Sequence, residues 1–121
     1  MYFYIIFYFF LELFKCNAVK NIPNIQPFHF PPNIIENQKF QVICGLIHEE
    51  DVTFSWLKNG KMFTPNSQVK ISYLPGISII AFNKISVTNT GNYTCIAKNE
   101  FGSSEYSAQL LVKGMFLFHI M

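Results

Sequence analysis

The sequence predicts an all-β fold, a sandwich of two facing antiparallel sheets with a disulfide between them. Cys44 and Cys95 lie 51 positions apart, and the sole tryptophan, Trp56, follows the first cysteine by 12 positions. Tyr93 lies two positions before the second cysteine, in the run Gly-Asn-Tyr-Thr-Cys. In such a sandwich the disulfide joins the sheets, the tryptophan packs on it, and the tyrosine hydroxyl holds the corner before its strand. The alternative for the two cysteines is a pair of free, buried thiols.

Segments with the composition and alternation of β-strands follow one another from residue 39 to residue 113. The dipeptides Asn59-Gly60 and Pro75-Gly76 are typical of tight turns between strands. The expected strands are Lys39–Leu46, Val52–Lys58, Lys61–Phe63, Val69–Tyr73, Ile77–Phe82, one that carries Tyr93, Cys95 and Ala97, and a last one that carries Ala108, Leu110 and Val112. The expected core signature is Trp56, Ile80, Phe82, Ile85 and Tyr93.

Prolines interrupt the first strand. Pro27, Pro31 and Pro32 cannot donate to a sheet ladder, so we expect Ile25–Ile35 at an edge, in two pieces that pair with different sheets. The interval between the tryptophan and the second cysteine is too short for the additional strand of a variable-type domain. Together these features predict an immunoglobulin-like two-sheet Greek-key sandwich of the intermediate (I-set) type.

The two ends of the chain differ in composition from the strand region. Residues 1–18 contain an apolar run and end on Cys16-Asn17-Ala18, so we expect a signal peptide that is cleaved after Ala18. An uncleaved membrane anchor is the alternative, although about 13 apolar residues fall short of the roughly 20 that span a bilayer. Residues 19–24 would be a linker, residues 25–113 the domain, and residues 114–121 an apolar tail left by truncation or readthrough. Loss of the leader removes Cys16 and leaves an even pair of cysteines, which an oxidising compartment favours.

Charge and histidine placement argue against nucleic-acid binding and catalysis. The formal net charge is +2, and the nine basic residues, all lysine, are scattered rather than clustered on one surface. His29, His48 and His119 lie in unrelated segments without a nucleophile motif beside them. The run His48-Glu49-Glu50-Asp51 matches no metal-ligand spacing and is typical of a solvated loop. We therefore expect no enzyme activity, no cofactor, no metal site and no small-molecule substrate.

Asn92-Tyr93-Thr94 is the sole Asn-x-Thr sequon of the chain. Because Tyr93 and Cys95 are expected to point inward, Asn92 should point outward, where a glycan would not disturb the core. We expect Asn92 to be a glycosylation site, with an unoccupied surface amide as the alternative.

Several motifs resemble those of one family of adhesion receptors. They are Pro-Phe-His-Phe-Pro at 27–31, Ser-Trp-Leu-Lys-Asn-Gly-Lys at 55–61, Gly-Asn-Tyr-Thr-Cys at 91–95 and Ala-Lys-Asn-Glu-Phe-Gly at 97–102. Over residues 25–113 the chain resembles an immunoglobulin repeat of the Down syndrome cell adhesion molecules (Dscam), especially those of arthropods. One departure is Asn89, where such repeats usually carry an aspartate paired with a basic residue; we expect its amide to hydrogen-bond near Lys70 instead.

The resemblance implies a non-enzymatic extracellular domain for cell adhesion and recognition, with homophilic contacts between repeats, in neuronal self-recognition, axon guidance or arthropod immunity. The chain would then be secreted or form the outer part of a membrane-associated cell-surface receptor. The alternative is a secreted, soluble binding or immune factor with a single domain. The candidate contact residues are Phe28, His29 and Phe30 on the edge strand, or Lys58, Lys98 and Tyr106 on an exposed sheet.

Overall fold

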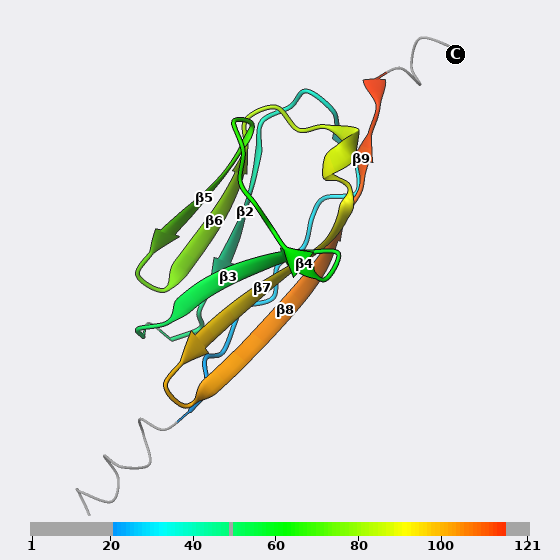
Figure 1. The fold of residues 1–121 in the computed structure, drawn as a ribbon. Helices are drawn as coiled ribbons and strands as arrows, with labels where there is room; N and C mark the ends of the chain where they lie inside the picture. Colours follow the sequence, from blue (N-terminus) through cyan, green and yellow to red (C-terminus); the bar gives the residue numbers. More distant parts are fainter. Residues whose placement is uncertain (1–20, 49, 116–121) are drawn as a thin grey trace, which may run out of the picture.

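The computed structural model describes residues 21–48 and 50–115, shown in colour in Figure 1. In this part of the chain the elements follow in the order β1 (Ile34–Ile35), β2 (Phe40–Gly45), β3 (Thr53–Lys58), β4 (Lys61–Met62), β5 (Val69–Leu74), β6 (Ile77–Phe82), the 3-10 helix η1 (Val87–Asn89), β7 (Gly91–Asn99), β8 (Gly102–Leu110) and β9 (Val112–Lys113). From β2 to β6, each strand begins and ends within one residue of the predicted bounds.

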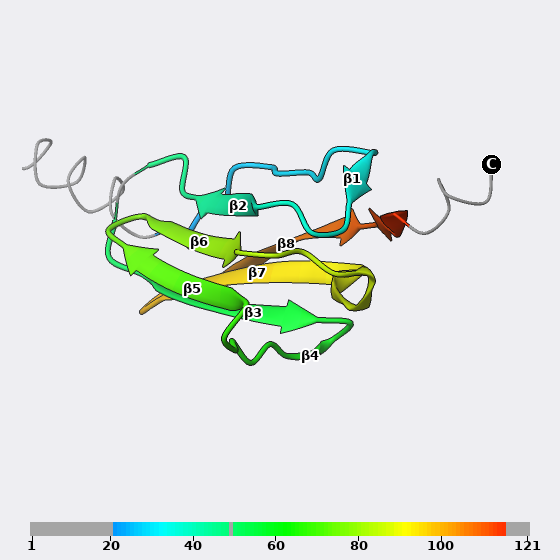
Figure 2. The same cartoon turned by 90° about the horizontal axis from the view of Figure 1, so that it is seen from above.

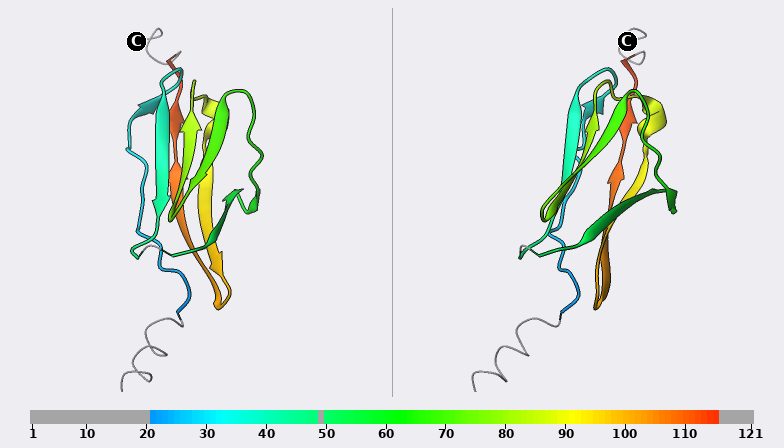
Figure 3. Two further views of the ribbon diagram at one scale, coloured as in Figure 1. Left: turned by 90° about the vertical axis from the view of Figure 1, so that its left-hand side faces the viewer. Right: turned by 60° about the vertical axis from the view of Figure 1, so that its left-hand side comes forward.

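Two antiparallel sheets face each other, as the views in Figure 2 and Figure 3 show. One sheet has the strand order β2-β6-β5 and the other β4-β3-β7-β8. β2 and β3 follow each other in sequence but belong to different sheets, since β2 pairs with β6 and β3 pairs with β7. This arrangement confirms the predicted immunoglobulin-like sandwich.

The proline-rich first segment divides into two pieces with different partners, as predicted. Ile25 forms an isolated antiparallel bridge with Leu46, just beyond the end of β2. Farther along, β1 pairs in parallel with β9, which continues the direction of β8. The prolines at 27, 31 and 32 lie between these two contacts, where the backbone forms no strand. The last predicted strand is split at Leu111 because the chain there changes its partner from β7 to β1.

Two tight turns set the register of their hairpins. Asn59 and Gly60 have φ of 52° and 79°, so both lie in the left-handed region, as a type I′ turn between β3 and β4 requires. Gly76 has φ of 72° and follows Pro75, which is the pattern of a type II turn between β5 and β6. Both dipeptides therefore form the turns that the sequence predicted.

A continuous core fills the space between the sheets. All five signature residues belong to it, with side chains at most 1% exposed. The other buried hydrophobic residues of this cluster are Ile25, Phe28, Ile34, Val42, Cys44, Leu46, Val69, Cys95, Ala97, Leu110 and Val112. The core thus draws on every main strand and on the proline-rich segment.

The described chain enters and leaves at opposite ends of the sandwich (Figure 1). At one end the side-chain amide of Asn99, by the β7–β8 turn, donates to the carbonyl of Asn21 at 2.9 Å. At the other end the backbone N–H of Met115 donates to Glu36 at 2.9 Å. Residues 1–20 and 116–121 lie outside the described residues, so the signal peptide and the nature of the tail stay predictions. Within the described ranges, no helix has the length and apolar character that crossing a membrane requires.

Candidate functional site

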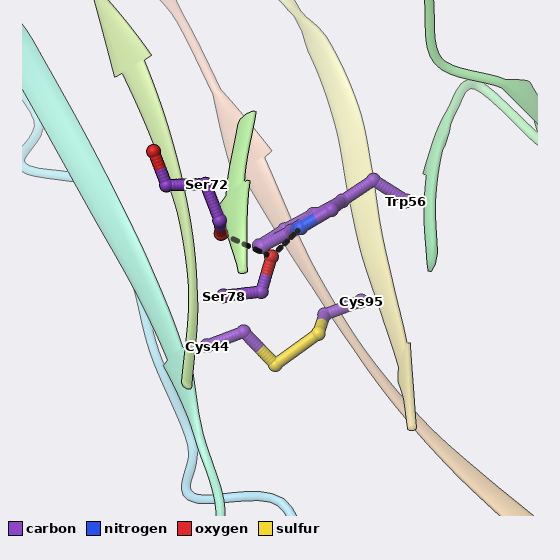
Figure 4. The surroundings of a disulfide bond; sticks show 5 residues. All are labelled: Cys44, Trp56, Ser72, Ser78 and Cys95. Carbon is purple, nitrogen blue, oxygen red and sulfur yellow. Dashed lines mark hydrogen bonds between the residues drawn. A yellow bond between two sulfur atoms is a disulfide. The ribbon is translucent and has the colours of Figure 1, made fainter. Parts of the chain in front are cut away.

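The centre of the sandwich consists of a disulfide, a tryptophan and a serine (Figure 4). Cys44 on β2 and Cys95 on β7 are bonded and fully buried, with their Cα atoms 6.5 Å apart. The Nε1–H of Trp56 on β3 donates to the hydroxyl of Ser78 at 2.9 Å. The Ser78 hydroxyl donates in turn to the carbonyl of Ser72 at 3.2 Å. The predicted disulfide is therefore confirmed, and the indole N–H beside it has an acceptor.

Ser78 is a residue of this centre that sequence reasoning missed. It is fully buried on the inward face of β6, two positions before Ile80, and it lies opposite Cys44 in the neighbouring strand. A buried indole N–H nearly always has a hydrogen-bond partner. The available signal was a small polar residue at an inward position of a strand that is otherwise apolar.

Tyr93 closes the corner between β6 and β7. Its hydroxyl donates to the carbonyl of Asn89 at 2.6 Å, which is the role predicted for it. The Asn89 side-chain oxygen accepts the backbone N–H of Ser86 at 2.7 Å, within a capping box around η1. The expectation that the Asn89 amide bonds near Lys70 is therefore wrong, because the turn that contains Asn89 uses its acceptor.

The Tyr93 ring is enclosed by aromatic side chains. The ring centroids of Phe30 and Phe63 each lie 5.7 Å from its own. This burial raises the pKa of the phenol well above its ordinary value near 10. The ammonium of Lys58 lies 6.0 Å from the ring centroid and donates to the carbonyl of Thr88 at 2.6 Å. The ammonium of Lys58, a candidate contact residue, therefore interacts with groups of its own domain.

The aromatic residues of the edge strand belong to the core rather than to a contact surface. Phe28 is 8% exposed and packs against Trp56 and Tyr106, with centroid distances of 5.7 and 5.1 Å. Phe30 is half-buried against Tyr93 and Phe40. The proposal that Phe28, Phe30 and Tyr106 face a partner is therefore corrected, because all three pack inward. The cause is local: residues 28 and 30 share one side of an extended segment, and residue 29 takes the other.

The remaining candidate contact residues are exposed. His29 is exposed on the proline-rich segment, and Lys98 is exposed near the end of β7. Each of the two candidate surfaces therefore keeps one exposed member, His29 on the edge segment and Lys98 on the sheet. In the described ranges, no group of three or more His, Cys, Asp or Glu side chains is placed to hold a metal ion.

Asn92 lies at the start of β7, beside the β3–β4 turn. Its backbone N–H donates to the side-chain oxygen of Asn59 at 2.9 Å, and its carbonyl accepts the Asn59 N–H at 2.8 Å. The sequon threonine, Thr94, shares a hydrogen bond with Ser107 at 2.6 Å. The Asn92 side chain is partly exposed, while its neighbour Tyr93 is fully buried. Glycosylation at Asn92 stays a prediction, and its site lies on the sheet that contains β7.

The outer face of the β2-β6-β5 sheet carries an aliphatic band that sequence reasoning did not single out. Its members are Ile43, Leu74, Ile77 and Ile79, and the register places Ile43 opposite Ile79 and Ile77 opposite Leu74. Ile43, Leu74 and Ile77 are 50, 53 and 36% exposed. The signal was present in the outward positions of β2 and β6, where isoleucines stand in place of polar residues.

Sequence comparison places this geometry in a family. The model of the immunoglobulin I-set domain matches residues 23–112. The cell adhesion molecule DSCAM of Rattus norvegicus is 34% identical over 96 residues, which cover 79% of this chain and 5% of that protein. Dscam2 of Drosophila melanogaster is 30% identical over 93 residues, which cover 75% of this chain and 4% of that protein. These identities do not single out the arthropod members.

Solved structures agree with the sequence relatives. The Dscam1 Ig7 domain, isoform 5, matches with a TM-score of 0.70 and 25% identity, covering 75% of this chain and 96% of that one. Titin domain M7 matches with a TM-score of 0.68 and 25% identity, covering 78% of this chain and 97% of that one. The chain belongs to the immunoglobulin I-set family and, within it, is similar to repeats of the DSCAM cell adhesion molecules.

Proposed function

We propose that this domain is an extracellular adhesion and recognition module that acts by homophilic protein contact. The observation that carries the proposal is the similarity to DSCAM, which spans nearly the whole described domain. The buried disulfide supports an oxidising, extracellular location. The chain would be secreted or form the outer part of a cell-surface protein, with neuronal self-recognition, axon guidance or arthropod immunity as the setting.

The aliphatic band is the surface that we assign to this contact. It is the place on the β2-β6-β5 sheet where neighbouring apolar side chains remain exposed, and such patches mark interaction sites more often than scattered single residues do. The predicted glycan on Asn92 would lie on the other sheet, because Asn92 belongs to β7. A glycan there would leave the band free.

A second copy of the domain fits this face by charge. Lys39 precedes β2 and Lys70 lies near the start of β5, so both mark one end of the face. The loop after the other end of β2 carries Glu50 and Asp51. A two-fold axis that runs across the strands would lay the aliphatic band on itself. It would also keep Lys39 and Lys70 of one copy away from those of the other. Each copy's two lysines would then lie toward the partner's loop with Glu50 and Asp51.

The contact should be weak for a single domain. Three strands of about six residues cover roughly 300 Å² in plane, from strand spacing and rise, whereas standard interfaces bury about 800 Å² per partner. We therefore expect a monomer in dilute solution. Dense display would restore binding strength by raising the effective concentration of neighbouring copies.

A bead-clustering assay tests the proposal. Beads coated densely with the wild-type domain should cluster, and beads coated with Ile43→Lys/Leu74→Lys should stay dispersed, because the two new charges would meet their counterparts across the two-fold axis. The control is Met62→Lys/Leu111→Lys, which places the same charges at residues that are 71 and 54% exposed and lie outside the band. This control should cluster like the wild type. Thermal melting of each protein verifies that it is folded.

Two results would count against the proposal. Clustering of the band variant at the wild-type level would remove the assigned face while leaving homophilic contact in place. Failure of the wild type to cluster, where a known adhesion repeat does so under the same conditions, would favour the secreted single-domain binding factor.

A further inference from the structure

A hollow lies beside the aliphatic band, at the end of the face where β2 and β5 begin. Its volume is about 730 Å³, within the roughly 300–1,000 Å³ of small-ligand sites. The polar residues around it are Lys39, Gln41, Ser67, Lys70 and Asn83. No residue of the aliphatic band lines it.

The strand register explains why the surface is hollow here. Ala81 on β6 lies directly between Gln41 on β2 and Lys70 on β5. All three side chains point away from the core, because their neighbours Val42, Ile80 and Phe82 point inward. Two long polar side chains therefore flank a single methyl group, and the hollow lies above it.

Two positively charged side chains, those of Lys39 and Lys70, border the hollow. Lys39 and Lys70 are both exposed. In the described part of the chain, the lysine ammonium groups that donate hydrogen bonds are those of Lys58 and Lys113. Along β2, β5 and β6 the described sequence contains no aspartate or glutamate, so no carboxylate of these strands neutralises the pair. The hollow is therefore suited to an anion.

We infer that the hollow binds a sulfated sugar unit of an extracellular polysaccharide. Two lysines meet the sulfate or carboxylate groups, and the Gln41, Ser67 and Asn83 side chains supply hydrogen-bond donors for hydroxyl groups. Lys39 and Lys70 are 31 positions apart in sequence, but the fold brings both to this hollow, where their charges attract an anion. The inference does not depend on homophilic contact; it requires only the oxidising extracellular setting that the disulfide indicates.

The shape of the site favours a sugar over other polyanions. A nucleic acid requires a longer basic stripe than two lysines provide. An acidic peptide offers carboxylates and backbone carbonyls to the same groups, so a polyglutamate peptide is the competitor against which the sugar is tested. A sugar ring with one or two sulfates fills a compact hollow and uses both kinds of group.

Titration with a heparin-derived hexasaccharide tests the inference. We expect the wild type to bind, with amide chemical-shift changes around Gln41, Lys70 and Ala81. Lys39→Gln/Lys70→Gln should weaken binding by about tenfold, since it removes two exposed ionic contacts of modest strength. The control Lys61→Gln/Lys98→Gln removes the same charge from the other sheet. The Kd of this control should change by less than about twofold, because salt screens charges that lie far from the hollow.

A third variant tests the shape of the hollow without changing its charge. Ala81→Leu leaves the net charge unchanged and fills the space between Gln41 and Lys70, so it should also weaken binding several-fold while the fold persists. Equal weakening in both lysine variants would show that binding follows net charge alone, and the site would be overturned. Absence of binding by the wild type would overturn the site as well. Equally tight binding of the desulfated hexasaccharide, or of a polyglutamate peptide of the same charge, would overturn the sulfated sugar as the ligand.

Discussion

At the scale of single residues, the core of this domain depends on polar atoms that satisfy one another beside the disulfide. Trp56 brings a large ring and one N–H donor into a region closed to water, and Ser78 is its acceptor. Tyr93 brings a hydroxyl that donates to Asn89 at the edge of the same core. Leaving either group buried without a partner would cost more free energy of folding than its hydrogen bond contributes to stability.

Ser78→Ala should destabilise the domain by about 1–3 kcal/mol, because the indole N–H of Trp56 would lose its acceptor in a site that water does not reach. Ser103→Ala serves as the control, since Ser103 is exposed on β8. It should change stability by no more than about 0.5 kcal/mol. Guanidinium unfolding measures both values. Equal midpoints for the two variants would show that the Trp56–Ser78 bond contributes nothing to stability.

Tyr93 should make stability fall at high pH. Burial raises the pKa of the folded-state phenol above its value near 10 in the unfolded chain. The unfolded state therefore releases this proton first, so the contribution is complete below about pH 10 and is lost as the pH rises above it. Tyr93→Phe removes the titrating group and costs about 1 kcal/mol for the lost hydrogen bond at neutral pH. A pH series of unfolding midpoints should be flatter for the variant above pH 10; parallel curves would contradict this account.

The orientation of single residues was the part of the site that the sequence predicted least well. Phe28 follows Pro27 and Phe30 precedes Pro31. Such an irregular edge segment gives no neighbouring strand from which to infer the inward side. The sequence predicted that the Tyr93 hydroxyl holds the corner but not its acceptor, Asn89. The partner of the Asn89 side chain depends on a 3-10 turn that has no periodic signal in the sequence. The aliphatic band was not predicted, because single apolar residues at outward positions are common and only the register of β2, β6 and β5 shows that these four are neighbours.

At the scale of elements, the strands were predictable because three independent signals agree. Alternation places inward residues along β2 and β6, the cysteine and tryptophan positions link the sheets, and Asn59-Gly60 fixes one hairpin. The splitting of the last strand into β8 and β9 was not predictable, because it depends on pairing with β1, which lies about 80 residues earlier in the chain.

Gly60→Ala should destabilise the β3–β4 hairpin by about 1–2 kcal/mol, because φ at this position is 79° and an L side chain is strained there. Gly45→Ala is the matched control. A methyl group at Gly45 would find its nearest atom 4.0 Å away, and the backbone is not in the left-handed region. Unfolding midpoints should fall for the first variant and stay level or rise slightly for the second. A reversed order would contradict the turn assignment.

At the scale of the whole molecule, the chain combines a predicted leader, a disulfide and a domain whose ends lie at opposite poles. Protein expressed in animal cells should begin at Val19 and contain no free thiol, because the predicted leader carries Cys16 away. Reduction should cost about 4 kcal/mol, as expected for opening a loop of roughly 50 residues. Intact-mass and thiol-labelling measurements test both points. Retention of Met1 together with reactive Cys44 and Cys95 would refute the export of this chain.

The two ends of the described chain lie at opposite ends of the sandwich, and this position affects how the domain could act within an array. A chain that enters at the β7–β8 turn and leaves beyond β9 can be joined end to end with others, while the two sheet faces stay open. Weak contacts between faces would then add along a tandem array, as effective concentration predicts. The aliphatic band is the place where the domain would meet its copy.

The concentration dependence of the amide chemical shifts tests this central claim most directly. Spectra of the isolated wild-type domain should change between micromolar and millimolar concentration, and the changes should centre on Ile43, Leu74, Ile77 and Ile79. The amides of β3 and β7 should move little over the same range. Spectra that stay constant up to several millimolar, or that change mainly on the β4-β3-β7-β8 sheet, would contradict self-recognition through the assigned face.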